Sequence, residues 1–330
     1  MPHLRFFQLD VFTDQAFHGN PLAVFPDAED NAAHLDEVMM QAIAREMNLS
    51  ETVFVLEATD GRALRRLRIF TPARELPFAG HPVVGTWNLL ARREAGGIVP
   101  HPESGTGTVR VHQEIGIGVL PVDIDFEGVE PVRVVMTQGA FNIETSSIGS
   151  AVRRDIMACL GLRDGEMDEA LPVQVISTGL PFLVVPIATL DALGRCRVQD
   201  APLGELYEKL GATGCLAFTR ETRDQNNEIE SQAHARMFAP ADNIAEDPAT
   251  GSACGALGGY LISHSRLDTQ TNNIEQASKF IIEQGDFIGR PSRIEVEVTM
   301  NPDESADGRR VECVRVGGSS VIVAEGVLRF

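Results

Sequence analysis

The sequence GNPLAVFP at residues 19–26 returns in similar form as GLPFLVVP at residues 179–186. Two further pairs of matching segments follow in the same order along the chain: FTPA at 70–73 with FAPA at 238–241, and GHP at 80–82 with GSA at 251–253. The three shifts are nearly equal and close to half the chain length. We therefore interpret the chain as two similar halves that arose by duplication.

Most of each half has the pattern of short strands, which are rich in β-branched and aromatic residues and separated by turn residues. The expected strands of the first half are 5–12, 22–25, 52–56, 64–70, 108–112, 116–125 and 132–137. Those of the second half are 173–178, 182–187, 216–219, 233–238, 280–283, 293–299, 311–316 and 321–328. Short links predominate, which favours antiparallel pairing.

Helical spacing of apolar residues predicts amphipathic helices at 35–47 and 151–160. The segments 82–93 and 252–263 differ, because they are apolar or small on every side. A helix with no polar face is buried all round. We therefore expect an α+β protein of two pseudo-symmetric domains, each a mostly antiparallel, barrel-like sheet around one central helix.

Composition excludes several classes of function. The 330 residues carry a formal net charge of -19, which would repel nucleic acid. The five cysteines are odd in number and none forms a CxxC pair, so neither a disulfide framework nor a zinc ribbon is expected. The first residues do not have the pattern of a signal peptide, and no segment approaches the roughly 20 apolar residues of a membrane helix. We expect a cytoplasmic protein with no nucleic-acid or membrane partner.

Glu51 and His81 are two candidates for chemistry. Glu51 lies between the helix at 35–47 and the apolar strand TVFVL, where partial desolvation would suit a general base. His81 precedes Pro82, a residue that suits the start of a helix, where free N–H groups favour an anion. A solvated turn carboxylate and a structural helix cap are the respective alternatives.

Asp247 is the third candidate, and it precedes the second all-apolar helix in the segment EDPATGS. The N–H groups of Gly251 and Ser252 open that helix. The alternative is a turn or capping carboxylate before Pro248. If the halves face each other, both helix starts converge on one cleft and the two acids flank a C–H bond. That arrangement fits proton transfer without a metal or cofactor.

Other sites of chemistry receive little support. No HExxH, GxSxG, P-loop or GxGxxG motif is present, and the histidines lack metal-ligand spacing. Cys254 lies inside an apolar helix and reads as a core residue. We expect no metal site.

Four segments together resemble the PhzF-like family of phenazine-biosynthesis isomerases, in the diaminopimelate epimerase fold superfamily. They are QLDVFTDQAFHGNPLAVF, NLSETVFV, RIFTPARELPFAGHPVVGT and MFAPADNIAEDPATGSACGA, and they occur in family order. The resemblance implies two domains, here 1–143 with a returning strand at 318–330, and 144–317, with the active site between them. Family members are often homodimers.

The resemblance also implies roles for individual residues. The family's acid/base glutamate falls on Glu51, its histidine on His81 and its aspartate on Asp247. The residues implied to bind substrate are Ser50, Gly80, Gly251 and Ser252. The related racemases use two cysteines, and no cysteine stands in either loop, which disfavours a two-thiol mechanism.

These observations predict a cofactor-independent isomerase that moves a proton on a small carboxylate substrate, of the dihydro-hydroxyanthranilate isomerase type. An amino-acid epimerase or racemase would return the proton to the same carbon. A non-catalytic binding or scaffold protein would keep the fold and bind a ligand without proton exchange. A metal hydrolase is a weaker alternative.

Overall fold

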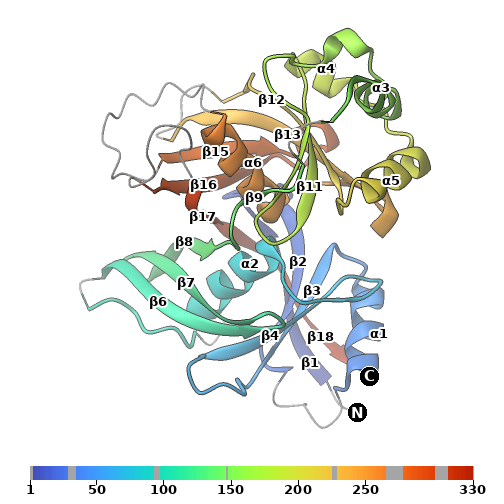
Figure 1. The fold of residues 1–330 in the computed structure, drawn as a ribbon. Coiled ribbons are helices and arrows are strands. Elements are labelled where there is room, and N and C mark those ends of the chain that lie inside the picture. Colours follow the sequence, from blue (N-terminus) through green and yellow to red (C-terminus); the bar gives the residue numbers. More distant parts are fainter. Residues whose placement is uncertain are drawn as a thin grey trace. The chain divides into compact units, whose positions relative to one another are not determined.

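A computed structural model describes residues 3–28, 35–92, 97–103, 105–145, 148–224, 229–264, 278–301 and 311–329 (Figure 1). The chain forms two compact units, Met1–Thr137 with Gly317–Phe330, and Gln138–Val316. The final segment therefore belongs to the same unit as the N-terminus. The bounds expected from the sequence differ from these by a few residues and stay predictions.

The first unit contains ten strands or parts of strands and two helices among its described residues. The strands are β1 (His3–Val11), β2 (Asn20–Phe25), β3 (Glu51–Leu56), β4 (Arg65–Phe70), β5 (Glu75–Leu76), β6 (Thr106–Ile115), β7 (Gly118–Glu127), β8 (Glu130–Thr137), the end of β17 (Val311–Gly318) and β18 (Ser320–Arg329). The helices are α1 (Glu37–Met47) and α2 (Gly80–Ala91).

The second unit has more helices. Its strands are β9 (Asn142–Ile143), β10 (Gln174–Ser177), β11 (Pro181–Pro186), β12 (Cys215–Thr219), β13 (Ser231–Ala239), β14 (Ile244–Asp247), β15 (Ser278–Gln284), β16 (Ser292–Met300) and most of β17. Its α-helices are α3 (Ser150–Cys159), α4 (Leu190–Gly194), α5 (Asp200–Lys209) and α6 (Gly251–Ser263).

The two units repeat one scheme of strand pairing. In the first, β1–β2 and β3–β4 are antiparallel, whereas β2–β3 and β4–β6 are parallel. In the second, β10–β11 and β12–β13 are antiparallel, whereas β11–β12 and β13–β15 are parallel. Parallel neighbours require a crossover, and a helix supplies each one: α1 and α2 in the first unit, α4 with α5, and α6, in the second. The pseudo-symmetric α+β fold is therefore confirmed.

The helices α2 and α6 are enclosed within their own units. Every residue of α2 is buried, and it contacts β1, β2, β3, β7, β8 and β18. A Cβ atom on Gly85 of α2 would lie 2.6 Å from Val11 Cγ2 and 2.7 Å from Leu22 Cδ2. One on Gly258 of α6 would lie 2.5 Å from Val296 Cγ1. Glycine is thus required where strand side chains press against the central helices.

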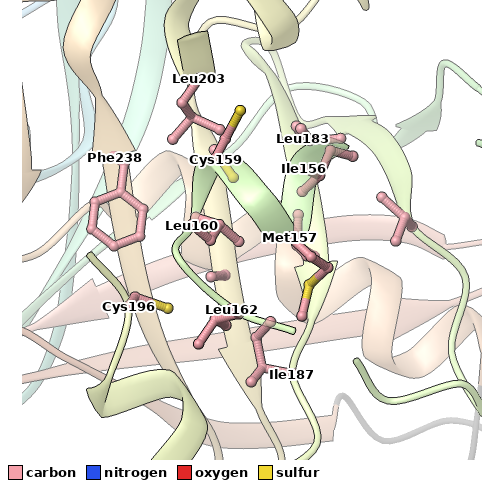
Figure 2. Close-up of a cluster of buried hydrophobic side chains, with 14 of the residues drawn as sticks. Ile156, Met157, Cys159, Leu160, Leu162, Leu183, Ile187, Cys196, Leu203 and Phe238 are labelled. Carbon is pink, nitrogen blue, oxygen red and sulfur yellow. The ribbon is translucent and has the colours of Figure 1, made fainter. Parts of the chain in front are cut away.

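A second core lies on the outer face of each sheet. In the first unit, α1 packs on Ala23, Phe25, Phe54 and Phe70, while Leu22 on the opposite face meets α2. Since successive residues of a strand point to opposite faces, strands covered on both sides read as continuous apolar runs. In the second unit, helices α3 and α5 cover the equivalent face, and Figure 2 shows their side chains against β11.

The sequence missed two helices, α4 and α5. The segment DAPLGELYEK that forms α5 contains Pro202 and Gly204, which weaken its helical pattern. Pro202 is tolerated because it lies in the first turn, where backbone N–H groups have no acceptor within the helix. The helix expected at 82–93 begins earlier, at Gly80, so that Pro82 is its third residue. Residue 93 lies outside the described residues.

Candidate active site

Glu51 and His81 contact each other within the first unit. His81 Nε2 lies 3.2 Å from Glu51 Oε2, and the two side chains are 5% and 14% exposed. The approach is within ion-pair distance, but the two atoms are not aligned as a hydrogen bond. The structure therefore brings these two residues together, and their catalytic roles stay predictions.

Local structure explains the direction of the Glu51 side chain. Helix α1 ends at Met47, and the left-handed conformation of its C-cap residue Asn48 (φ 51°) turns the chain into β3. Glu51 is the first residue of β3 and lies opposite Leu22 of the parallel strand β2. Leu22 meets α2, so alternation along β3 also directs Glu51 toward α2, while Phe54 faces α1.

His81 is a neutral imidazole over the working range of most enzymes. Burial lowers the pKa of His81 from 6.5 to about 3, because the charged form would lose its hydration. A neutral ring has one nitrogen that donates and one that accepts. His81 can therefore share a proton with the Glu51 carboxyl group or with a substrate oxygen.

The start of helix α2 has no side-chain cap. Its N-cap residue is Ala79, which has no side chain able to bond the first N–H groups. Gly80 and His81 supply the first two of these groups, and both residues are buried. Such a helix start attracts a carboxylate through its N–H groups and its dipole. Ser50 is half-buried beside Glu51 in the sequence.

Asp247 is the candidate acidic residue of the second unit. It ends strand β14 and is 7% exposed. The Thr250 hydroxyl donates a short hydrogen bond to Asp247 Oδ2. Thr250 is also the N-cap residue of α6, but its side chain makes no capping bond to that helix in the described structure. The hydroxyl is used to hold Asp247 instead.

Gly251 and Ser252 are the first two residues of α6, and both are buried. They stand at the helix start as Gly80 and His81 do in α2. The two helix starts are equivalent under the internal repeat, since each follows a short strand and opens the helix of a parallel crossover.

Gln284 was missed by the sequence analysis. It ends β15, is fully buried, and its side-chain amide bonds the Asp247–Thr250 segment. Its segment, FIIEQGDF, shows only an apolar strand followed by polar residues. A glutamine at the end of such a strand gives no signal for a site.

The predicted site residues therefore form two groups. Glu51, His81, Ser50 and Gly80 belong to the first unit, and Asp247, Gly251 and Ser252 belong to the second. That the two groups form one site stays a prediction. Within the described part of the chain, no set of three His, Cys, Asp or Glu side chains could hold a metal ion. No described helix has the length and apolar character of a membrane span.

Residues 9–326 match the family model described as "Phenazine biosynthesis-like protein" (PhzC-PhzF). The chain is 33% identical over 324 residues to a trans-2,3-dihydro-3-hydroxyanthranilate isomerase from Pseudomonas aeruginosa, with 98% of each chain covered.

Two solved structures share the fold. A PhzF-family phenazine biosynthesis protein from Bacillus anthracis superposes with a TM-score of 0.83, at 27% identity and with 100% of both chains covered. A hydroxyproline epimerase from Agrobacterium vitis superposes with a TM-score of 0.60, at 12% identity, covering 99% of this chain and 91% of the other. The second likeness concerns the fold alone.

Proposed function

Because the chain belongs to the phenazine biosynthesis-like (PhzC-PhzF) family, we propose that it is an isomerase that moves a proton on a small carboxylate substrate. The membership confirms the resemblance seen in the sequence motifs. The observation that carries the proposal is the 3.2 Å contact between Glu51 and a buried, neutral His81 beside an uncapped helix start.

In the proposed reaction, the Glu51 carboxylate takes a proton from a carbon near the substrate carboxylate. The C–H electron pair spreads into the conjugated system of the substrate, and the proton is then delivered to another carbon. The substrate gains and loses one proton, so the reaction needs no oxidant or reductant. His81 supports this step because a neutral imidazole can relay a proton, accepting one at one ring nitrogen as it gives one up from the other, with no net change in its own charge.

The proposal includes a role for the second group of residues. We infer that Asp247 and the first N–H groups of α6 face Glu51 and His81 across a cleft between the units. Two helix starts would then stabilise the substrate carboxylate and the negative charge that develops during proton transfer. The substrate class follows from the relative's name and from these anion-binding elements.

Deuterium incorporation tests the proposal. Trans-2,3-dihydro-3-hydroxyanthranilate and a panel of amino carboxylates are incubated with the protein in D₂O and followed by NMR. We expect solvent deuterium at a carbon of one compound, and a rate about 10²–10⁴-fold lower in Glu51→Gln. Glu57→Gln is the matched control, because Glu57 is exposed and directly follows the same strand.

The outcomes separate the alternatives. Deuterium at a new carbon supports the isomerase, and deuterium at the original carbon with inversion supports an epimerase. Binding without exchange supports a non-catalytic protein. Equal exchange in wild type and Glu51→Gln contradicts the proposal. The expected homodimer rests on the family resemblance and is measured by light scattering.

A further inference from the structure

We propose that Gln284 is a positioning residue that orients Asp247 and the first turn of α6. The expected effect on catalysis rests on the function proposed above. The hydrogen bonds from which the positioning role is inferred lie wholly within the second unit. Gln284 does not touch the predicted proton-transfer atoms of Glu51 or His81 in any described contact.

The Gln284 amide uses all of its hydrogen-bonding capacity on one short segment. Its Nε2 donates to the Asp247 carbonyl oxygen at 2.7 Å and to Thr250 Oγ1 at 3.1 Å. Its Oε1 accepts from the Thr250 backbone N–H at 3.1 Å and from the Cys254 thiol at 3.3 Å. A side-chain amide has two donor hydrogens and two acceptor lone pairs, so its orientation is fixed. The reversed amide would place donors against donors.

This orientation fixes the direction of the Thr250 hydroxyl. Because Thr250 Oγ1 accepts a hydrogen from Gln284, its own hydrogen is free to point to Asp247 Oδ2, where a short hydrogen bond is found. The chain of bonds runs from Gln284 through Thr250 to Asp247. In this chain the Asp247 carboxyl group accepts the last hydrogen bond, which fixes its orientation. Successive hydrogen bonds in such a chain strengthen each other.

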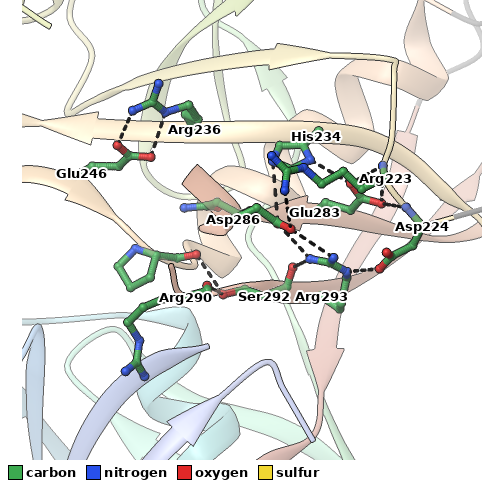
Figure 3. A network of polar contacts seen from close by, with 12 residues as sticks. Arg223, Asp224, His234, Arg236, Glu246, Glu283, Asp286, Arg290, Ser292 and Arg293 are labelled. Carbon is green, nitrogen blue, oxygen red and sulfur yellow. Dashed lines mark hydrogen bonds and ion pairs between the residues drawn. The ribbon is translucent and has the colours of Figure 1, made fainter. Parts of the chain in front are cut away.

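Contacts on the opposite face of strands β15 and β14 fix the positions of Gln284 and Asp247. Glu283 accepts hydrogen bonds from His234 Nδ1 at 2.8 Å and from the backbone N–H groups of Arg223 and Asp224 at 2.9 and 2.8 Å (Figure 3). Since side chains alternate along a strand, fixing Glu283 on one face of β15 fixes Gln284 on the other.

Strand β14 is anchored in the same way. Glu246, which precedes Asp247, forms a two-pronged ion pair with the buried Arg236, at 2.9 and 2.6 Å (Figure 3). Arg236 also donates to the carbonyl oxygens of Leu193 and Cys196. The outward-facing acids, Glu283 of β15 and Glu246 of β14, are thus held by hydrogen bonds. The residues that follow them, Gln284 and Asp247, lie at the start of α6.

Gln284→Met tests the proposal by removing the amide while keeping the length of the side chain. We expect kcat toward trans-2,3-dihydro-3-hydroxyanthranilate to fall about 10–100-fold with a smaller change in KM, because a misplaced acid slows the chemical step. Gln174→Met is the matched control. Gln174 is also buried, and it bonds His264 at the opposite end of α6. The control should keep kcat.

Gln284→Glu gives a readout that a purely structural role would not produce. A Glu carboxylate at this position would face the Asp247 carbonyl oxygen without a donor, whereas the protonated acid can donate one hydrogen there. We expect the ratio of variant to wild-type kcat to rise as pH falls. A ratio that stays flat with pH, together with equal kcat in Gln284→Met and Gln174→Met, overturns the proposal.

Amide hydrogen exchange tests the positioning role without any substrate. In Gln284→Met the Thr250 amide loses its acceptor, so exchange should quicken over residues 249–252 and stay unchanged there in Gln174→Met. If wild type acts on no compound of the panel but this local change is found, the proposed function fails and the positioning role stands. Unchanged exchange over 249–252 overturns the positioning role, whatever the activity.

Discussion

The Nε2 atom of His81 lies 3.2 Å from the Oε2 atom of Glu51, although 30 residues separate them in the chain. The first residue of a strand and the second residue of a buried helix are brought together because β3 and α2 pack against each other. A neutral imidazole beside an acid can act as a hydrogen-bonding partner or as a relay, which accepts a proton at one ring nitrogen while it gives one up from the other. This relationship carries the proposed chemistry.

The His81 ring should stay neutral from roughly pH 5 to pH 8. Burial lowers its pKa to about 3, so the folded protein resists protonation of this ring. In NMR spectra of ¹⁵N-histidine-labelled protein, the His81 resonance should not titrate over this range. In urea the same resonance should titrate near 6.5. Titration near 6.5 in the folded protein would contradict the buried, neutral state.

Thr250→Val should lower kcat, whereas a threonine substitution elsewhere in the second unit with the same loss of stability should not. The substitution removes the hydroxyl that donates to Asp247 and accepts from Gln284 Nε2, and it keeps the backbone N–H that donates to Gln284 Oε1. Thr213→Val is a suitable control, because the Thr213 hydroxyl also donates a hydrogen bond in the second unit, to the Pro181 carbonyl oxygen. Both variants should lose on the order of 1 kcal/mol of unfolding free energy.

Turnover separates the two threonine variants. We expect kcat for trans-2,3-dihydro-3-hydroxyanthranilate to drop about tenfold or more in Thr250→Val but not in Thr213→Val. Without the Thr250 hydroxyl, the Asp247 carboxyl group is no longer held in one orientation. Steady-state kinetics together with denaturant unfolding would measure this. Equal kcat in the two variants would show that the hydroxyl does not serve Asp247.

Glu283 should stabilise the protein in a pH-dependent way. Burial acts to raise its pKa, but hydrogen bonds from His234 and from the N–H groups of Arg223 and Asp224 lower it from 4.5 to about 2. The folded pKa is depressed, so the stabilisation is complete above 4.5 and is lost as pH falls toward 2. The shift corresponds to about 3 kcal/mol.

Glu283→Gln tests this pH dependence. Urea unfolding followed by circular dichroism between about pH 2.5 and 6 should show a shallower loss of stability on acidification than in wild type. Glu312→Gln, at an exposed position of β17, should keep the wild-type slope. An unchanged slope in Glu283→Gln would mean that another group controls acid unfolding.

Gly85→Ala should destabilise the first unit by about 1–3 kcal/mol. The added methyl group would lie 2.6 Å from Val11 Cγ2 and 2.7 Å from Leu22 Cδ2, which outweighs the better helix propensity of alanine. Trp87 is the only tryptophan and lies on the same helix, so its fluorescence reports unfolding of this unit. Gly61→Ala, with no atom within 4 Å of the added methyl group, should be near neutral.

The sequence predicted much of the fold because the repeat and the apolar patterns are local signals. The two buried helices were recognised by their lack of a polar face, and all of α2 and all of α6 except its last residue, Ser263, are indeed buried. Helix α5 was missed because Pro202 and Gly204 masked its pattern. The apolar side chains of α5 pack on β11 and β12, and this packing stabilises the helix. Such contacts between distant segments cannot be read from the local sequence.

For the candidate site, the sequence by itself determined which groups are present: an acid before a strand, a histidine and a glycine at one helix start, and Asp247 before the other. Only the tertiary structure decided that His81 is dry and neutral beside Glu51, and that Gln284 holds the Asp247 segment. The physical reason is that a motif is a property of neighbours along the chain. A pKa and a hydrogen-bond partner depend instead on burial and distance, which strands far apart in sequence create by packing around one helix.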